Sequence, residues 1–169
     1  MPQNIELKAR LADIDFARQA ARNAGATEHG VLIQTDTYFR ASRGRLKLRE
    51  IAGHTAELIF YERSNRVEAR RSRYRRIEAP EPAALREMLE MALGVLSIVR
   101  KRRELWLLDN VRIHLDDVEG LGTFFELEAI LDAKHDEEMC HRQIEELSMA
   151  FAISATDLVA GSYGELVKP

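Results

Sequence analysis

Charged and apolar residues alternate along five segments of this chain, in patterns that could build a charged site. The clearest segment is 4–10, in which Glu6, Lys8 and Arg10 lie on one side of an extended strand and Ile5 and Leu7 on the other. The same alternation returns at 45–49, 101–105, 112–116 and 125–129. The acidic positions are Glu6, Asp116, Glu126 and Glu128. The basic positions are Lys8, Lys47, Arg49, Lys101, Arg103 and Arg112.

These residue types suit two parts of one chemistry. Glu126 and Glu128 are two residues apart on one strand and therefore point the same way, and with Glu6 they could bind Mg²⁺ or Mn²⁺ through oxygen ligands. Several separate lysines and arginines suit an oligophosphate, whose charges need several donors. Bases for phosphate and carboxylates for metal together indicate phosphoryl-transfer chemistry.

Alternation by itself has a simpler interpretation, since many antiparallel sheets bury one face and expose a charged face to water. Here, however, the polar side is almost entirely charged in five separate strands. If the apolar sides pack outward against helices, the charged sides line the inside of a barrel. A barrel of eight strands has room for side chains and one small ligand.

The periodicities predict eight strands and three or four helices. We expect strands at about 4–10, 28–39, 45–51, 56–63, 72–79, 97–108, 110–117 and 123–131. We expect helices at 14–24, 82–93 and 136–151, with a short helix near 155–160. Most strands are joined by short turns, which favour antiparallel neighbours. The predicted fold is therefore α+β, an eight-stranded antiparallel β-barrel with helices packed outside.

Composition limits the classes of protein to consider. The 169 residues are enough for one domain, 1–169, and the net charge of −3 gives no general attraction for nucleic acid. We interpret the arginines at 70–76 as a solvated strand and loop. No apolar run approaches the ~20 residues that span a membrane, and no signal-peptide pattern opens the chain. The single cysteine, Cys140, fits a reducing environment, so we expect a cytoplasmic location with neither membrane nor nucleic acid as partner.

The order and spacing of these motifs resemble the CYTH superfamily, also called triphosphate tunnel metalloenzymes, which includes class IV adenylate cyclases and thiamine triphosphatases. The first strand is similar to the family's Glu-x-Glu-x-Lys motif, with Asn4 in place of the first Glu. The segments that also match are 35–39, 46–50, 99–103, 112–128 and Ser162-Tyr163.

The resemblance implies a single CYTH-like domain whose tunnel of eight strands binds a triphosphate. It implies phosphate contacts from Lys8, Lys47, Arg49, Lys101, Arg103 and Arg112, with Arg63 and Arg73 as further candidates. It implies metal ligands at Glu6, Glu126 and Glu128, with Asp116 as a further ligand or as an orienting residue. Tyr38 and Lys8 are the catalytic candidates, although Tyr38 could equally be a core aromatic.

Three functions remain open from the sequence. The first is metal-dependent hydrolysis of inorganic tripolyphosphate, thiamine triphosphate or a nucleoside triphosphate. The second is a class IV adenylate cyclase, which converts ATP to cyclic AMP and pyrophosphate. The third is a module that binds nucleotide or polyphosphate without turnover, which Asn4 motivates because it removes a negative charge from the metal motif. We expect the protein to be a monomer or a homodimer.

Overall fold

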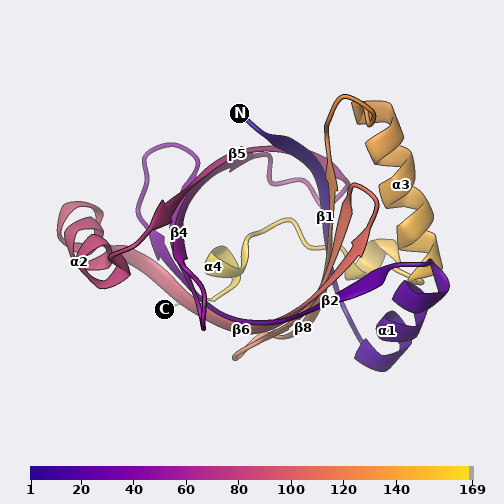
Figure 1. The fold of residues 1–169 in the computed structure, drawn as a ribbon, viewed down its shortest axis with the longest axis horizontal. Helices are drawn as coiled ribbons and strands as arrows, with labels where there is room; N and C mark the ends of the chain where they lie inside the picture. Colours follow the sequence, from indigo (N-terminus) through magenta and orange to yellow (C-terminus); the bar gives the residue numbers. More distant parts are fainter. Residues whose placement is uncertain (168–169) are drawn as a thin grey trace.

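Eight antiparallel strands form a closed barrel, as Figure 1 shows in a view through the ring. The computed structural model describes residues 1–167. The strands are β1 (Gln3–Arg10), β2 (Thr27–Phe39), β3 (Arg45–Ile51), β4 (Ala56–Arg63), β5 (Arg70–Ala79), β6 (Val95–Leu108), β7 (Val111–Val118) and β8 (Gly122–Ile130). Their order around the barrel is β1-β5-β4-β3-β2-β6-β7-β8. The predicted barrel and its α+β class are confirmed.

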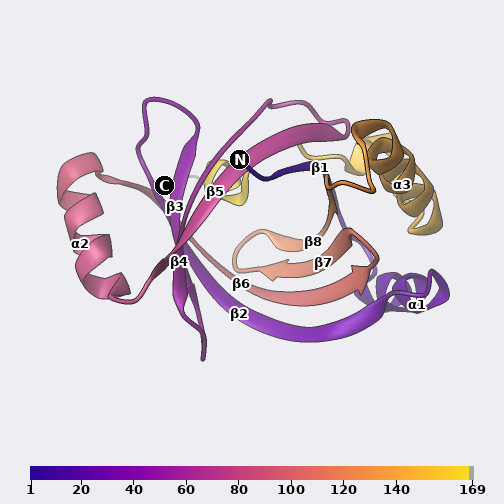
Figure 2. The ribbon, with the colours of Figure 1, turned by 45° about the horizontal axis from the view of Figure 1, so that its top comes forward.

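Helices cover the barrel on two opposite sides. The helices are α1 (Ile14–Asn23), α2 (Pro82–Leu93), α3 (Glu137–Ala150) and α4 (Tyr163–Leu166), with a 3₁₀ turn at Ala155–Asp157. Figures 1 and 2 show α1 and α3 on one side and α2 on the other. The predicted helix near 155–160 is thus a single short turn. The last helix, α4, had no counterpart among the predicted elements.

The largest core lies outside the barrel, beneath α1 and α3. Ile5 and Leu7 of β1 point outward and are 0% and 5% exposed, because they pack with small and apolar residues of the two helices. Ala17 and Ala21 of α1 lie in the same cluster, and their small side chains let the helix approach the strands closely. Burying these apolar sides outside leaves the alternate, charged side chains of the same strands inside.

The start of α1 shows how local sequence positions a covering helix. The side chain of Asp13 accepts hydrogen bonds from the backbone N–H groups of Asp15 and Phe16, at 2.9 and 3.0 Å. This N-cap satisfies two of the donors that a helix end leaves free. Gly25, with φ +83°, then follows the C-cap and allows the chain to turn into β2.

The opposite helix, α2, packs on a smaller core. Its Leu85 and Leu89 contact a cluster that contains Phe39 of β2 and Leu48 of β3. Pro82 opens the helix, where its missing N–H and fixed φ cost nothing. The outward face of β3 is therefore covered by a helix, as the outward face of β1 is.

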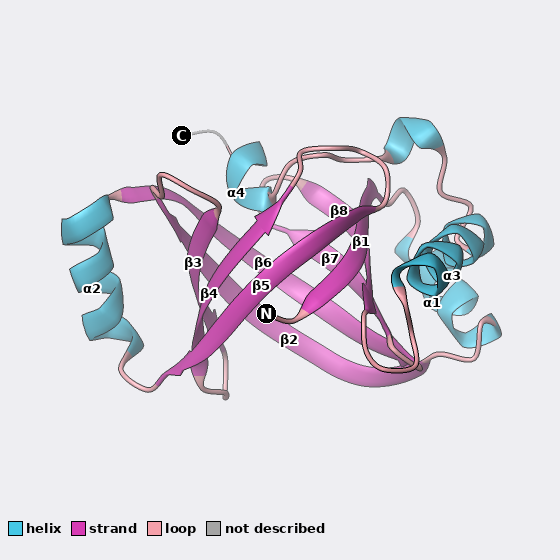
Figure 3. Ribbon diagram, turned by 90° about the horizontal axis from the view of Figure 1, so that it is seen from above, coloured by secondary structure: helices cyan, strands magenta, loops and turns pink. Residues whose placement is uncertain are grey.

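The segment after α3 crosses one end of the barrel. Figure 3 shows α4 above the ends of the strands, and Figure 1 shows it inside the outline of the ring. Tyr163 is 2% exposed and meets the Phe124 ring edge-on, with centroids 5.0 Å apart. A Cβ added at Gly164 would lie 2.6 Å from Cγ of Tyr38, so only glycine fits there without a shift. The short helix thus closes this end by close packing.

Among the described residues, none of the helices combines the length and apolar character that crossing a bilayer requires.

Candidate functional site

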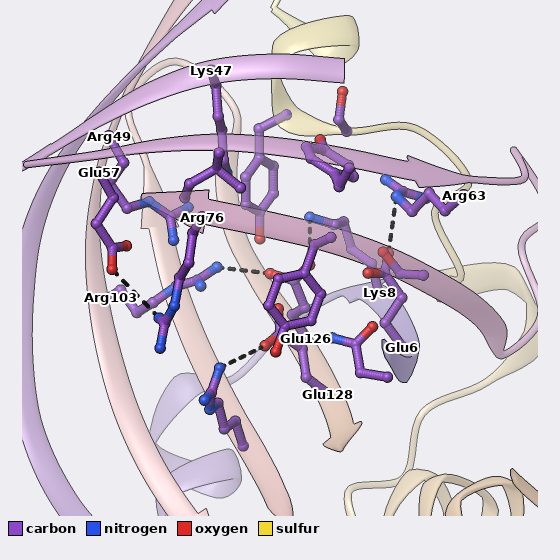
Figure 4. Close-up of a pocket in the computed structure, with 18 of the residues that line it drawn as sticks. Glu6, Lys8, Lys47, Arg49, Glu57, Arg63, Arg76, Arg103, Glu126 and Glu128 are labelled. Carbon is purple, nitrogen blue, oxygen red and sulfur yellow. Dashed lines mark hydrogen bonds and ion pairs between the residues drawn. The ribbon is translucent and has the colours of Figure 1, made fainter. Parts of the chain in front are cut away.

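The inside of the barrel holds a charged cavity to which all eight strands contribute (Figure 4). Eleven of the residues predicted for the site reach it: Glu6, Lys8, Tyr38, Lys47, Arg49, Arg63, Lys101, Arg103, Arg112, Glu126 and Glu128. Asp116 is 0% exposed and lies at the cavity wall, bonded to Arg103. Arg73 does not reach the cavity. The charged edges of separate strands therefore converge inward, as the alternation predicted.

The acidic residues gather on β1, β7 and β8. Strand pairing sets Glu6 opposite Glu128, and sets Glu126 between Lys8 on β1 and His114 on β7. Lys8 Nζ lies 3.2 Å from Glu126 Oε1. Burial would raise the pKa of Glu126, but the attraction of Lys8 outweighs burial and holds the pKa well below its ordinary value. Glu126 is therefore ionised and available to a cation.

Arg103 is held in place by two carboxylates. It donates to both oxygens of Asp116, at 2.7 and 2.6 Å, and to Glu126 at 2.7 Å. The Tyr163 hydroxyl of α4 also donates to Asp116, at 2.7 Å. Burial would raise the pKa of Asp116, but Arg103 and Lys101 outweigh it and lower the pKa. These contacts hold Asp116 beside Arg103 and fix the orientation of the guanidinium.

Another buried carboxylate organises the bases on the other side. Asp36 of β2 is 0% exposed and accepts hydrogen bonds from Lys47 at 2.8 Å and from Arg49 at 2.7 and 2.8 Å. Lys101 lies 3.6 Å from the same carboxylate. Burial would raise the pKa of Asp36, yet Arg49 and Lys47 hold it well below its ordinary value. Asp36 is not among the residues predicted for the site, although it lies two residues from Tyr38 and therefore points to the same, inner side of β2.

The positive charge of the lysines and arginines around the cavity nevertheless exceeds the negative charge of these carboxylates. Burial lowers the pKa of Lys8, and it lowers the pKa of Lys101 further, with Arg103 adding to the shift. Burial and the neighbouring Arg49 lower the pKa of Lys47 to about 8. An anion in the cavity would relieve both the desolvation and the repulsion. The interior is therefore suited to an oligoanion.

The β4–β5 side supplies further arginines. Arg63 Nε lies 2.9 Å from Glu6 Oε1, and Arg70 Nε lies 3.5 Å from the same atom. Burial raises the pKa of Glu6 against the opposing effect of Arg63. Arg76 pairs with Glu57 at 3.5 Å on the cavity wall.

Arg73 corrects one expectation about this side. The Arg73 side chain is exposed. Arg73 pairs with Gln3 of β1 and Glu62 of β4, and it is one of the residues of β5 that point outward. The inward residues of this strand are Arg70, Ser72, Tyr74 and Arg76. Because side chains alternate along a strand, placing Arg73 inward would have turned all of these outward. Arg76 therefore replaces Arg73 among the candidate phosphate contacts, while Arg70 lies against Glu6.

Three side chains of the acidic side could hold a divalent cation. One ligand atom from each of His114, Glu126 and Glu128 lies within 4.8 Å of the other two. Burial, reinforced by Arg103, lowers the pKa of His114, so its imidazole is neutral and can bind metal. The donor set fits the metal that the fold implies. Glu6, also predicted as a ligand, instead meets Arg63 and Arg70.

Tyr38 lies both in the cavity wall and in the core, the two environments that the sequence left open for it. It lines the cavity and also belongs to a core cluster with Val99 and Tyr163. Burial raises the pKa of its hydroxyl well above the ordinary value, and Tyr61 adds to the shift. Tyr38 therefore stays protonated and can donate a hydrogen bond, but it is a poor base.

A closed antiparallel barrel with a base-rich interior and a carboxylate cluster defines the architecture of a triphosphate tunnel. The CYTH domain family matches residues 2–163, so this chain belongs to the CYTH family. A candidate adenylate cyclase of Methanocaldococcus jannaschii is 23% identical over 171 residues, covering 96% of this chain and 97% of that protein.

Solved structures share the fold. The PH1012 protein of Pyrococcus horikoshii has a TM-score of 0.85 at 23% identity, with 98% of this chain and 99% of that chain covered. A Hippeastrum protein, described as a candidate adenylyl cyclase with a dominant triphosphatase activity, has a TM-score of 0.65 at 15% identity. That match covers 94% of this chain and 91% of the Hippeastrum chain. At these identities the similarity establishes the fold, not the activity.

Proposed function

We propose that this protein is a metal-dependent phosphohydrolase that acts on a triphosphate compound inside the barrel. The observation that carries the proposal is the ring of inward cations whose charge exceeds that of the buried carboxylates. The cations that face the cavity are Lys8, Lys47, Arg49, Arg63, Arg76, Lys101, Arg103 and Arg112. Separate donors on different strands suit the separate oxygens of a linear triphosphate.

The chain's own residues would bind and orient the substrate. Arg103, fixed by Asp116, presents a rigid guanidinium that can stabilise charge as the terminal phosphoryl group departs. Lys8 lies between Glu126 and the Tyr163 ring, 3.4 Å from the ring centroid, and can hold a phosphate oxygen near the carboxylates. A bound Mg²⁺ or Mn²⁺ would offset phosphate charge and position the attacking water.

Phosphate release tests the proposal directly. The purified protein is incubated separately with tripolyphosphate, thiamine triphosphate and ATP, each with Mg²⁺ or Mn²⁺. We expect release from at least one of the three, and a much lower release from a Glu126→Gln variant purified in the same way. Release that is equal in both proteins would come either from a contaminating phosphatase or from a site that does not use Glu126. No release from any compound would refute hydrolysis.

The second candidate function is the adenylate cyclase reaction. Its support is the description of the M. jannaschii relative, which applies to that protein. The same incubation with ATP separates the two, since a cyclase yields cyclic AMP and pyrophosphate whereas a hydrolase yields phosphate. Chromatography of the nucleotide products distinguishes them. Tight triphosphate binding without any product would instead favour the binding module.

A further inference from the structure

Two polar atoms on the acidic side of the cavity are buried without a hydrogen-bond partner. They are Oδ1 of Asn4 on β1 and Nδ1 of His114 on β7, in side chains whose residues are 3% and 4% exposed. A buried acceptor without a partner costs roughly 1–3 kcal/mol. Most such atoms in folded proteins are paired. The nitrogen of His114 lies beside a carboxylate pair, where a bound cation would give it a partner.

The unpaired nitrogen of His114 faces the carboxylates. His114 Nδ1 lies 3.7 Å from Glu126 Oε2, which is too far for a hydrogen bond. Its ligand atom and those of Glu126 and Glu128 lie within 4.8 Å of one another. A cation that bonds to all three would draw them somewhat closer and would give the imidazole nitrogen its partner.

We propose that His114 is a metal ligand together with Glu126 and Glu128, and that the site therefore selects a first-row transition ion such as Mn²⁺ over Mg²⁺. The inference rests on the proposed function only for the presence of a metal in the cavity. Mg²⁺ takes oxygen ligands in near-ideal octahedral geometry, whereas imidazole suits the first-row transition ions. His114 would thus decide between the two ions that the carboxylates alone leave open.

Asn4 also favours a first-row transition ion over Mg²⁺. It lines the cavity two residues from Glu6, on the same inward face of β1, and it is a neutral amide. An amide oxygen offers a lone pair without a negative charge. The binding of Mg²⁺ depends on charge, since the ion must be drawn out of its tightly held water. A neutral amide at Asn4 therefore favours Mg²⁺ less than it favours an ion that gains strength from a nitrogen ligand.

The other histidines do not offer a competing nitrogen in the cavity. His29 lies on an exposed part of β2, and His54 is exposed in the turn after β3. His135 contacts Asp132 and Asp109 in the loop before α3, and His141 lies on α3 outside the barrel. A nitrogen signal from an ion bound in the barrel is therefore assignable to His114. His54→Gln is the matched control.

The first measurement is electron spin echo envelope modulation of Mn²⁺, added at less than one equivalent to the intact protein. We expect ¹⁴N modulation from a directly bound imidazole in the wild type and in His54→Gln, and its loss in His114→Gln. The wild-type spectrum decides the assignment even if His114→Gln folds poorly. Bound Mn²⁺ without nitrogen modulation would overturn the inference, while the proposed hydrolase function would stand.

The second measurement is competition between Mn²⁺ and Mg²⁺ for the same site, followed by the paramagnetic signal of free Mn²⁺. We expect His114→Gln to weaken Mn²⁺ binding by about tenfold or more and Mg²⁺ binding by less than about threefold. Equal loss for both ions would show that His114 only supports the fold. Absence of Mn²⁺ and Mg²⁺ binding, with or without tripolyphosphate, would refute both the inference and the metal-dependent function.

Discussion

Two walls of the barrel differ in what lies behind them. We call β1, β7 and β8 the covered wall, because α1 and α3 pack on its outer side. We call β4 and β5 the bare wall, because outward residues of β5 such as Arg73, Arg75 and Ile77 are exposed, the last at 57%. Figure 2 shows both helices beside the covered wall and away from β4.

The inner faces of the two walls differ accordingly. On the covered wall, Asp116 and Glu126 hold Arg103 at 2.6–2.7 Å, and these groups are almost fully buried. On the bare wall, Arg76 lies 3.5 Å from Glu57 and 52% of its side chain is exposed. Rigid, desolvated groups act more strongly on a bound charge than mobile, hydrated ones. We therefore expect the effects of mutation to fall from the covered wall to the bare wall.

The largest effect should come from Glu126→Gln on the covered wall. The change keeps the shape of the side chain but removes the charge that faces Lys8 and Arg103 and that would bind metal. We expect metal-dependent hydrolysis to fall by about 100-fold, with triphosphate affinity changed much less. Initial rates and calorimetric dissociation constants measure the two separately.

Glu119→Gln is the matched control for this change, because the Glu119 side chain is 71% exposed. It should leave both quantities at their wild-type values. A rate for Glu126→Gln within threefold of the wild-type rate would place the metal elsewhere.

The next largest effect should come from Lys101→Met, on the strand beside the covered wall. Lys101 is the most dispensable partner of these carboxylates, because Asp36 keeps Lys47 and Arg49, and Asp116 keeps Arg103. We expect triphosphate affinity to fall by about tenfold or more, while the unfolding temperature does not fall. Calorimetry and thermal unfolding without ligand test the two parts.

Lys134→Met, in an exposed position before α3, controls for the general effect of removing a lysine. If Lys101→Met unfolded well below the wild type, Lys101 would be a structural partner rather than a surplus cation.

A smaller effect should come from pH, through Lys47 on the strand next to the bare wall. Its pKa of about 8 means that it is charged below that pH and neutral above it. Only the charged form attracts phosphate, so triphosphate affinity should fall as pH rises through 8, by about three- to tenfold between pH 7 and 9. Binding near pH 8 should also take up protons, because a bound anion raises the pKa of Lys47.

Calorimetry in buffers of different ionisation enthalpy measures this proton uptake. In Lys47→Arg the side chain stays charged, so the pH dependence of triphosphate affinity should weaken. Part of the dependence should remain, because the pKa values of Lys8 and Lys101 are also lowered. Identical pH profiles for the two proteins would exclude Lys47 as the titrating group.

The covered wall was predictable because its outer face is apolar. Ile5 and Leu7 fix the parity of β1, so Glu6 and Lys8 could be placed inside from sequence alone. The same alternation along β7 places His114 inside the barrel, because it lies between Arg112 and Asp116 on one face of the strand. The sequence does not single out His114, because an imidazole between charged residues has no distinguishing spacing.

The bare wall was not predictable in this way. Residues 70–76 of β5 carry basic residues on both faces, so no apolar side marks which arginines point inward. Parity there is set by pairing with β1 and β4, which is a long-range property. The closing helix α4 is similar, since its position depends on contacts of Tyr163 with Asp116 and Phe124, both far away in sequence.

The smallest effect tests this parity directly, with two arginines that are neighbours on the bare wall. Arg76 reaches the cavity, whereas Arg75 points outward and is exposed. We expect Arg76→Ala to weaken triphosphate binding by about threefold, because its contact with phosphate is partly screened by water. Arg75→Ala and Arg73→Ala should not change binding, although each removes the same charge from the same strand. Loss of affinity in Arg75→Ala with none in Arg76→Ala would reverse the facing of β5, and equal losses in all three would mean that the wall acts only through its net charge.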